Sequence, residues 1–480
     1  MRAGVLALLV LGLLPAFAGA ALGAVPLTKV SNDPYTNTSS QHRTQVEPDT
    51  FAFGTTIVGA FQVGRFNNGG ASNVGWSRSA DGGSTWSHGN LPGTTTFAGG
   101  TYARVSDPSV AYDARHNVWM VSSLGINSSA VGVAVLVSRS TNGGATWSAP
   151  VVAASKPSGF LDKNWTVCDN TATSPYYGRC YTEWDDNADG NRIKMSTSAD
   201  GGLTWGPARN TANNATGLGG QPVVRPNGVV VVPIDNANET ALQVFRSTNG
   251  GASWGSTATV ATYRTHTVAG GLRTGPLPSA EIDGAGRVYV VWQDCRFRAS
   301  CSSNDIVLTT SVDGVAWTAV RRIPIDASTS TVDHFVPGLA VNRATSGSTA
   351  RLALAYYYYP TASCTSSTCR LYVGYVSSAN AGTSWSAPTQ LAGPMTLSWL
   401  PATTQGRMFG DYISTSFVSG RAYPMLSIAK VPSGTVFDQA MYVPTGGLAA
   451  TAGTAHATAT GAGSARPSAQ AARAPARTLR

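Results

Sequence analysis

Six copies of one short pattern recur along the chain: a serine, an aspartate or asparagine two positions later, a nearby glycine, and a closing tryptophan. Successive tryptophans lie between 49 and 68 residues apart. This period is too long for a small helical repeat and long enough for a four-stranded antiparallel sheet. The repeat therefore predicts an all-β protein, a β-propeller. The copies are residues 79–86, 140–147, 198–205, 247–254, 311–317 and 378–385.

Each copy is expected to form a hairpin turn, because it follows a run of strand-forming residues such as Ala134–Val137. Glycine supplies the positive φ that tight turns need, and the aspartate or asparagine side chain can accept backbone N–H groups across the turn. The tryptophan can cover the edge of the sheet. We interpret the copies as structural elements and not as catalytic sites.

These six turns resemble the Asp-box, or BNR, repeats of the sialidase-like β-propellers, and the resemblance covers about residues 46–443. Enzymes of that family hold the substrate carboxylate with three arginines. They use a tyrosine nucleophile activated by a glutamate, and an aspartate as acid and base. The resemblance thus implies a retaining glycoside hydrolase that acts on an acidic sugar.

The number of blades is predicted from a second marker, a short opening segment before an alternating strand. Seven openings occur, so we expect seven blades, with six as the alternative. The last blade lacks a fourth strand of its own. We expect residues 25–31 to supply that strand and remove a free sheet edge. The openings are residues 46–48, 106–108, 162–165, 220–222, 277–279, 335–337 and 407–412.

The chain is expected to be secreted and to have three parts: a signal peptide (1–24), the propeller (25–446) and a disordered tail (447–480). Arg2, the apolar run from Val5 to Leu14 and the small residues at 18–20 are typical of a signal peptide. No later stretch is apolar enough to cross a membrane. The tail holds too few large apolar side chains to offset the entropy of ordering.

The six cysteines fall into close pairs, which favours local disulfides in an oxidising compartment. A zinc site is the rival interpretation, but the spacings match no finger or ribbon. We therefore predict no metal site, with a calcium loop at residues 185–191 as a lesser possibility because it lacks the final glutamate. The expected pairs are Cys168 with Cys180, Cys295 with Cys301, and Cys364 with Cys369.

The formal net charge of +9 overstates how basic the folded part is. Without Arg2 and the four tail arginines the propeller carries +4 and contains no basic run. Nucleic acid is thus excluded as an expected partner. We expect a monomer that binds a glycan or polysaccharide and needs no nucleotide, haem or redox cofactor.

The resemblance also assigns site residues. Tyr412 is the expected nucleophile and Glu281 its base, and these two should converge with Arg296 and Arg370 on one pocket. The family's first arginine is missing, because Val46-Glu47-Pro48 stands at its place. Asn67 and Asn68 stand where the acid is expected, and an asparagine cannot transfer a proton. The replacements we expect are Asp107 as the acid, and Arg43 or Arg65 as the carboxylate clamp. Arg407 is a further expected ligand of the substrate.

Two other classes of function stay open at this point. The first is a noncatalytic propeller that binds a glycan or a cell-wall component through the same face. The second is a lyase that acts on uronate polysaccharides, in which arginine neutralises the carboxylate while a tyrosine or histidine abstracts a proton. The fold alone cannot decide among the three classes.

Overall fold

The computed structural model describes residues 25–451. The predicted signal peptide and residues 452–480 of the predicted tail lie outside the described residues. The described chain is all-β and antiparallel, as predicted. None of its helices is long and apolar enough to cross a membrane. Its helical segments are single 3₁₀ turns: η1 (Thr96–Ala98), η2 (Asn187–Asp189), η3 (Ala269–Gly271), η4 (Ala299–Cys301), η5 (Gly347–Thr349) and η6 (Leu397–Trp399).

The strands form antiparallel sheets in chain order, most of them four-stranded. The first eight strands of this series form two groups of four, and the two groups are joined by one pairing, between Ala71 and Val105. They are β2 (Gln41–Phe53), β3 (Thr56–Arg65), β4 (Ala71–Ser79) and β5 (Ser87–Asn90), then β6 (Arg104–Asp113), β7 (Val118–Ile126), β8 (Gly132–Ser140) and β9 (Val151–Ser155).

The next four sheets repeat this plan. The third is β10 (Leu161–Cys168), β11 (Cys180–Asp186), β12 (Arg192–Ser198) and β13 (Arg209–Asn210). The fourth is β14 (Gly217–Leu218), β15 (Val223–Val224), β16 (Val230–Asn236), β17 (Ala241–Ser247) and β18 (Ala258–Thr262). The fifth is β19 (Ser279–Ile282), β20 (Val288–Asp294), β21 (Asp305–Ser311) and β22 (Arg321–Arg322). The sixth is β23 (Asp333–Val341), β24 (Leu352–Tyr359), β25 (Arg370–Ser378) and β26 (Thr389–Thr396).

The last sheet contains both ends of the described chain. It is formed by β29 (Ser414–Val418), β30 (Arg421–Ser433), β31 (Val436–Pro444) and β1 (Leu27–Lys29). The pairing of β1 with β31 confirms that the N-terminal segment supplies the outer strand. The sheet also includes β32 (Leu448–Ala449), which pairs with β30. The ordered part therefore extends beyond the boundary predicted at residue 446.

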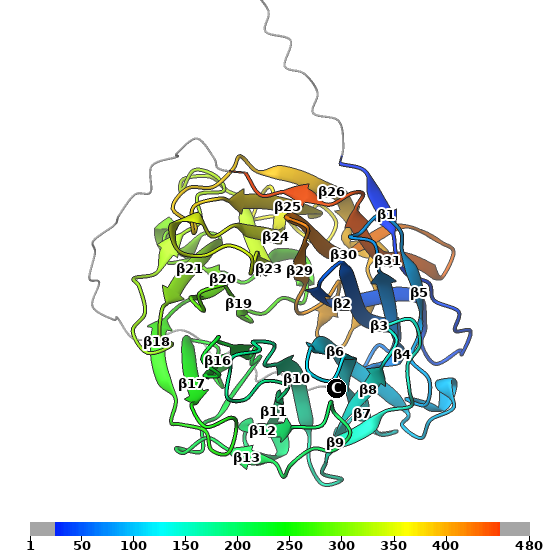
Figure 1. Cartoon of the computed structure of the whole chain (residues 1–480). Coiled ribbons are helices and arrows are strands. Elements are labelled where there is room, and N and C mark those ends of the chain that lie inside the picture. Colours follow the sequence, from blue (N-terminus) through cyan, green and yellow to red (C-terminus); the bar gives the residue numbers. More distant parts are fainter. Residues whose placement is uncertain (1–24, 452–480) are drawn as a thin grey trace, which may run out of the picture.

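The sheets follow one another around a common centre (Figure 1). One strand of each sheet lies on the inside, and these inner strands contact one another in the order β2, β6, β10, β15, β19, β23, β29 and back to β2. A small separate hairpin of β27 (Ala402–Thr403) and β28 (Gly406–Arg407) precedes the last sheet. This arrangement brings the predicted openings, which are far apart in sequence, to one central axis.

The hydrophobic core lies between neighbouring sheets, where side chains of both sheets form shared clusters. The tryptophans of all six repeated turns contribute to these clusters. Trp147, Trp254 and Trp385 are buried in them, and the others pack against their edges. The tryptophans thus join one sheet to the next.

The repeated turns form the hydrogen bonds that their composition predicts. In the second copy the Ser140 hydroxyl accepts the Gly144 N–H at 2.9 Å and donates to Asn142 Oδ1 at 2.9 Å. Asn142 Oδ1 also accepts the N–H of Thr146 at 3.0 Å. The other five copies form the same serine bonds. Their role as structural turns is confirmed.

Replacing Ser140 by alanine is expected to lower the free energy of unfolding by about 1–3 kcal/mol, because the buried Gly144 N–H loses its acceptor. Urea denaturation would measure the change. Ser128→Ala is the matched control, because Ser128 is exposed. An equal, small effect of both substitutions would contradict this role of the serine.

The three predicted disulfides are present. Cys168 and Cys180 face each other across β10 and β11. The other two bonds each close a short loop, with six residues of separation between Cys295 and Cys301 and five between Cys364 and Cys369.

Candidate functional site

The inner strands carry β-bulges at equivalent openings, and each bulge turns one side chain towards the axis. Glu47, Asp107 and Lys163 occupy these positions with φ values of 55°, 49° and 46°. The pairing register shifts at the same points in β2, β6 and β10. Left-handed backbone is costly for residues other than glycine, and such strain is concentrated at functional sites. The three residues are therefore candidates for a shared function.

These three side chains line a small central cavity of about 30 Å³. That space holds roughly one or two waters and is smaller than a sugar ring. Its wall combines carboxyl groups with cationic groups from several sheets. The charged lining residues are Glu47, Arg65, Asp107, Asp162, Lys163, Arg273 and Asp411.

Arg65 and Glu47 are held by Gln62 on β3. The Gln62 amide donates to Glu47 Oε2 and to the Ser106 hydroxyl, and Gln62 Oε1 accepts from Arg65 Nη1 at 3.1 Å. Arg65 Nε and Asp107 Oδ2 are buried and have no hydrogen-bond partner among residues 25–451. Because unpaired buried polar atoms are costly, these two are the groups best placed to bind a ligand.

Arg273 forms the main ion pair of the cavity. Its Nε donates to Asp411 Oδ1 at 2.9 Å, and its Nη2 donates to the other carboxylate oxygen. Burial alone would lower the pKa of Arg273, but Asp411 and then Glu47 raise it above its ordinary value. Lys163 Nζ lies 4.1 Å from the ring centre of Trp165 and 3.9 Å from that of Tyr412. The cavity thus holds cations that an acidic ligand can approach.

The cavity carboxyls titrate in the range that proton transfer near neutral pH requires. Burial, followed by the charge of Asp107, raises the pKa of Glu47 to about 8. Burial and then Asp162 raise the pKa of Asp107 to about 7, and burial raises that of Asp162 to about 6. Groups with such values can act as general acids or bases.

Stability is expected to fall between pH 7 and pH 9. Burial raises the pKa of Glu183, like that of Glu47, to about 8 from an ordinary value of 4.5. The folded state therefore binds more protons than the unfolded state, and this advantage disappears as the pH rises through 8. The expected loss in free energy of unfolding is about 1–3 kcal/mol, measured by urea denaturation at each pH.

The control for this pH dependence is Glu183→Gln, which should flatten the curve because it removes one of the two carboxyls. Burial lowers the pKa of Lys163, and this shift makes stability rise with pH. Because Glu183→Gln leaves Lys163 in place, the difference between the two curves gives the contribution of the Glu183 carboxyl. Equal stability at pH 7 and pH 9 in both proteins would contradict the expectation.

Some predicted site residues do meet at this cavity. Arg65 and Asp107 line it, and Tyr412 lies behind the wall with its ring against Lys163. The Tyr412 hydroxyl donates to the Pro108 carbonyl at 3.0 Å, and only 6% of the residue is exposed. Burial raises the pKa of Tyr412 well above its ordinary value, and Glu47 and Asp107 add to the shift.

The structure does not bring Glu281, Arg296 and Arg370 together with Tyr412 at the central cavity. Glu281 lines a different cavity and pairs with Arg343 at 3.6 Å. Arg296 binds Asp294 and the Thr262 carbonyl. These side chains lie in loops or strand ends that the bulges do not turn towards the cavity.

Arg370, Arg43 and Arg407 also lie outside the cavity lining. The exposed Arg370 bonds the carbonyls of Ser367 and Cys369. Arg43 is exposed, and its backbone N–H donates to Asp33. Arg407 lies in β28 and donates to the Leu400 carbonyl at 2.7 Å. The arginines of the cavity are Arg65 and Arg273.

The β27–β28 hairpin covers part of the cavity. Gln405 at its turn is a lining residue. The carbonyl of Ala402 accepts from Asn67 Nδ2 at 2.9 Å, and the Arg407 carbonyl accepts the Arg273 N–H at 2.8 Å. Asn67, which stands where the family's acid was expected, therefore anchors this hairpin.

Glu47, Asp162, Lys163, Arg273 and Asp411 were not predicted as site residues. A signal for two of them was available, because Glu47 and Lys163 occupy the same place in their openings as Asp107 does. Arg273 lies in the loop before the fifth opening, and no repeated pattern marks it.

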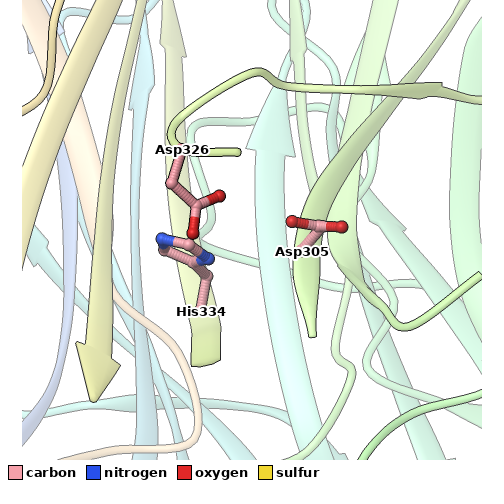
Figure 2. Close-up of side chains that lie close together, drawn as sticks. All are labelled: Asp305, Asp326 and His334. Atoms are coloured by element: carbon pink, nitrogen blue, oxygen red, sulfur yellow. The ribbon is translucent and has the colours of Figure 1, made fainter. Parts of the chain in front are cut away.

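A second group of ionisable side chains, Asp305, Asp326 and His334, lies close together away from the central cavity (Figure 2). Arg298 Nη2 donates to Asp305 at 2.6 Å and to Asp326 at 2.8 Å, and Arg322 Nε lies 2.9 Å from Asp305. Burial lowers the pKa of His334 to about 4. The two arginines therefore neutralise the two aspartates, and the group is a structural ion network.

The loop at residues 185–191, considered above for calcium, uses its carboxylates in other contacts. Asp186 pairs with Lys156 at 2.5 Å, and Asp189 pairs with Lys194 at 3.1 Å. It also contains the short turn η2, and the Asp186 side chain accepts the N–H of Ala188.

Comparison with known proteins gives one domain match. Residues 122–355 match the model of the BNR repeat-like domain. These residues, just under half of the chain, form a BNR-repeat domain. The matched range contains four of the six repeated turns, and it confirms their resemblance to Asp boxes. No curated protein matches the sequence.

Solved structures similar to this BNR-repeat protein include several sialidases. The Hadza microbial sialidase Hz136 is 18% identical, with a TM-score of 0.43 over 66% of this chain and 64% of that one, so the match spans less than two thirds of it. A leech intramolecular trans-sialidase is 13% identical, with a TM-score of 0.47 over 68% and 67%. A protein of unknown function from Dyadobacter fermentans is 14% identical, with a TM-score of 0.47 over 74% and 98%. These scores are low, and nothing about the site follows from them.

Proposed function

We propose that this BNR-repeat protein is a secreted, seven-bladed β-propeller that hydrolyses an acidic glycan at its central cavity. The seven-blade assignment is supported by the inner-strand contacts, which run from β2 through β29 and return to β2. The pairing of β1 with β31 closes the last blade. Secretion is supported by the apolar N-terminal segment and by three disulfides.

The observation that carries the hydrolase proposal is the meeting of Asp107 and Glu47 with Arg65 and Arg273 in one cavity. Glycoside hydrolysis needs a carboxyl that stays protonated near neutral pH, and Asp107 has a pKa of about 7. The arginine forks are suited to the carboxylate of an acidic sugar. An incoming carboxylate would share Arg273 with Asp411.

The retaining version of the proposal uses Tyr412 as the nucleophile. The phenol oxygen attacks the anomeric carbon while Asp107 protonates the leaving oxygen. Water, deprotonated by Asp107, then attacks the anomeric carbon, and the released tyrosine regains its proton from the group that took it. Glu47 replaces Glu281 as the group that takes the phenol proton, because Glu47 lines the same cavity as Asp107 whereas Glu281 does not. This step requires the form of the site in which Glu47 is ionised and Asp107 is protonated. The Tyr412 hydroxyl must first leave the Pro108 carbonyl.

A noncatalytic glycan-binding propeller is the second candidate, and the size of the cavity favours it. A volume of about 30 Å³ beneath the β27–β28 hairpin leaves no room for a sugar ring unless the hairpin moves. In this alternative the sugar lies across the mouth, and the charged groups bind it without reaction.

The deciding experiment is hydrolysis of a fluorogenic sialoside by the chain and by its Tyr412→Phe variant. Turnover that is lost in the variant supports the retaining mechanism. Turnover that survives identifies a hydrolase with another nucleophile. If neither protein turns the substrate over, while calorimetry shows that both bind it, the protein is the noncatalytic propeller.

A further inference from the structure

A second and larger cavity of about 450 Å³ opens near the opposite ends of the inner strands. β2 contributes Glu47 to the small cavity and Phe51 to the large one. Ser419, directly after the end of β29, also lines the large cavity. Ser419 lies beside Gly82 of the first Asp-box turn, so this mouth is on the Asp-box face. The volume falls within the range of small-ligand sites.

The wall of this second cavity contains aromatic rings that solvent can reach. Phe51, Phe53 and Phe417 line it, and Phe53 is 42% exposed. The Phe53 ring packs on Tyr112 with 4.5 Å between centroids, which fixes its orientation. A fixed, exposed phenylalanine offers a flat apolar surface to a ligand.

The wall of this cavity contains one ion pair, formed by Glu281 and Arg343. The two groups lie 3.6 Å apart, with 21% and 37% of their side chains exposed. Arg343 also lies over the Phe51 ring, 5.3 Å from its centre. A pair at this distance is loose, so both the carboxylate and the guanidinium keep bonding capacity for a ligand.

The second cavity has fewer charged groups than the first: two carboxylates, Glu281 and Asp283, and one cation, Arg343. Glu281 forms an ion pair with Arg343. The Asp283 carboxylate accepts hydrogen bonds from the backbone N–H groups of Ala285, Arg287 and Gly347. The cavity therefore presents an apolar ring surface beside one carboxylate and one guanidinium, together with neutral polar side chains such as Asn170 and Asn342.

We propose that this cavity is a second glycan site that binds an uncharged pyranose. The C–H face of the sugar packs on Phe53, and neighbouring hydroxyl groups bond Glu281 and Arg343. An acidic sugar is disfavoured here because its carboxylate would face Glu281. The site is separate from the central cavity and does not depend on hydrolysis there.

The test is saturation-transfer NMR on the full chain with methyl glycosides of galactose, glucose and N-acetylglucosamine, followed by titration of the best ligand. We expect binding of at least one glycoside at concentrations up to about 10 mM. Glu281→Gln and Phe53→Ala should each weaken it about tenfold. Phe97→Ala is the matched control, because Phe97 is 37% exposed and lies outside this cavity.

Sialic acid is the second probe, because it separates the two cavities. Its binding, and any sialoside turnover, should be unchanged in Glu281→Gln and Phe53→Ala. The proposal is overturned if no neutral glycoside binds the wild-type chain. It is also overturned if a bound glycoside is held equally well by both variants and by the Phe97→Ala control.

Discussion

Replacing Asp107 by asparagine is expected to lower the turnover of a sialoside by about two to four orders of magnitude. Asp107 lines the central cavity and leaves Oδ2 without a partner among residues 25–451. With a pKa of about 7, this carboxyl exists in both protonation states near neutral pH. Asparagine keeps the shape of the side chain but cannot donate and retake a proton. The measurement is kcat/KM across pH, in which the limb near pH 7 should disappear.

Asp189→Asn is the control, because Asp189 is 40% exposed and pairs with surface cations away from the cavity. Its turnover should equal that of the wild type. The urea midpoint of Asp107→Asn should also be compared, so that a loss of folded protein is not mistaken for a loss of chemistry. A folded Asp107→Asn variant with full turnover would remove Asp107 from the mechanism.

Replacing Arg298 by methionine is expected to lower the free energy of unfolding by about 3–5 kcal/mol. The Arg298 side chain is fully buried and pairs with Asp305 and Asp326. It also donates to the carbonyls of Ala327 and Ser330. Methionine fills a similar volume but leaves two aspartates with only Arg322 to neutralise them.

Arg370→Met is the matched control for the Arg298 prediction. Arg370 is exposed and also lies beside a disulfide, and its loss should cost less than about 1 kcal/mol. Urea denaturation of both variants measures the difference. A similar small loss in both would mean that Arg322 alone balances the aspartates.

The part of the fold that could be predicted is the part with local signals. The Ser140 and Asn142 pattern specifies a turn because its hydrogen bonds connect residues within four positions of each other. Cysteine pairs such as Cys364 and Cys369 were predictable for the same reason. The pairing of β1 with the last sheet was also predicted, although the two are far apart in sequence, because an incomplete last sheet needs a partner for its edge.

The site could be predicted only where the bulge positions repeat. Asp107 precedes the proline of its opening and faces the central cavity, as Glu47 does. Glu281 instead comes three residues after Pro278, as Phe51 comes three after Pro48. Three residues of strand are roughly 10 Å, so both side chains reach the cavity at the other end of the axis. A count of residues from the proline of each opening would have separated these two sites.

Arg273 could not be predicted because its role depends on a contact across the ring. It lies far from Asp411 in sequence, and the arrangement of the sheets around the central axis brings the two together. Arg296 and Arg370 were favoured by their order along the chain. The position of a residue along the chain indicates the sheet to which it belongs, but it does not indicate how far the side chain lies from the central axis.

The pairing of β1 with β31 has a consequence for the time course of folding. Leu27 pairs with Pro444, so this contact spans almost the entire described chain. Closing so long a loop is entropically costly unless the intervening sheets have already formed. β1 must therefore wait for the last sheet before it can pair, and until then β1 and β31 both present unpaired strand edges to other chains.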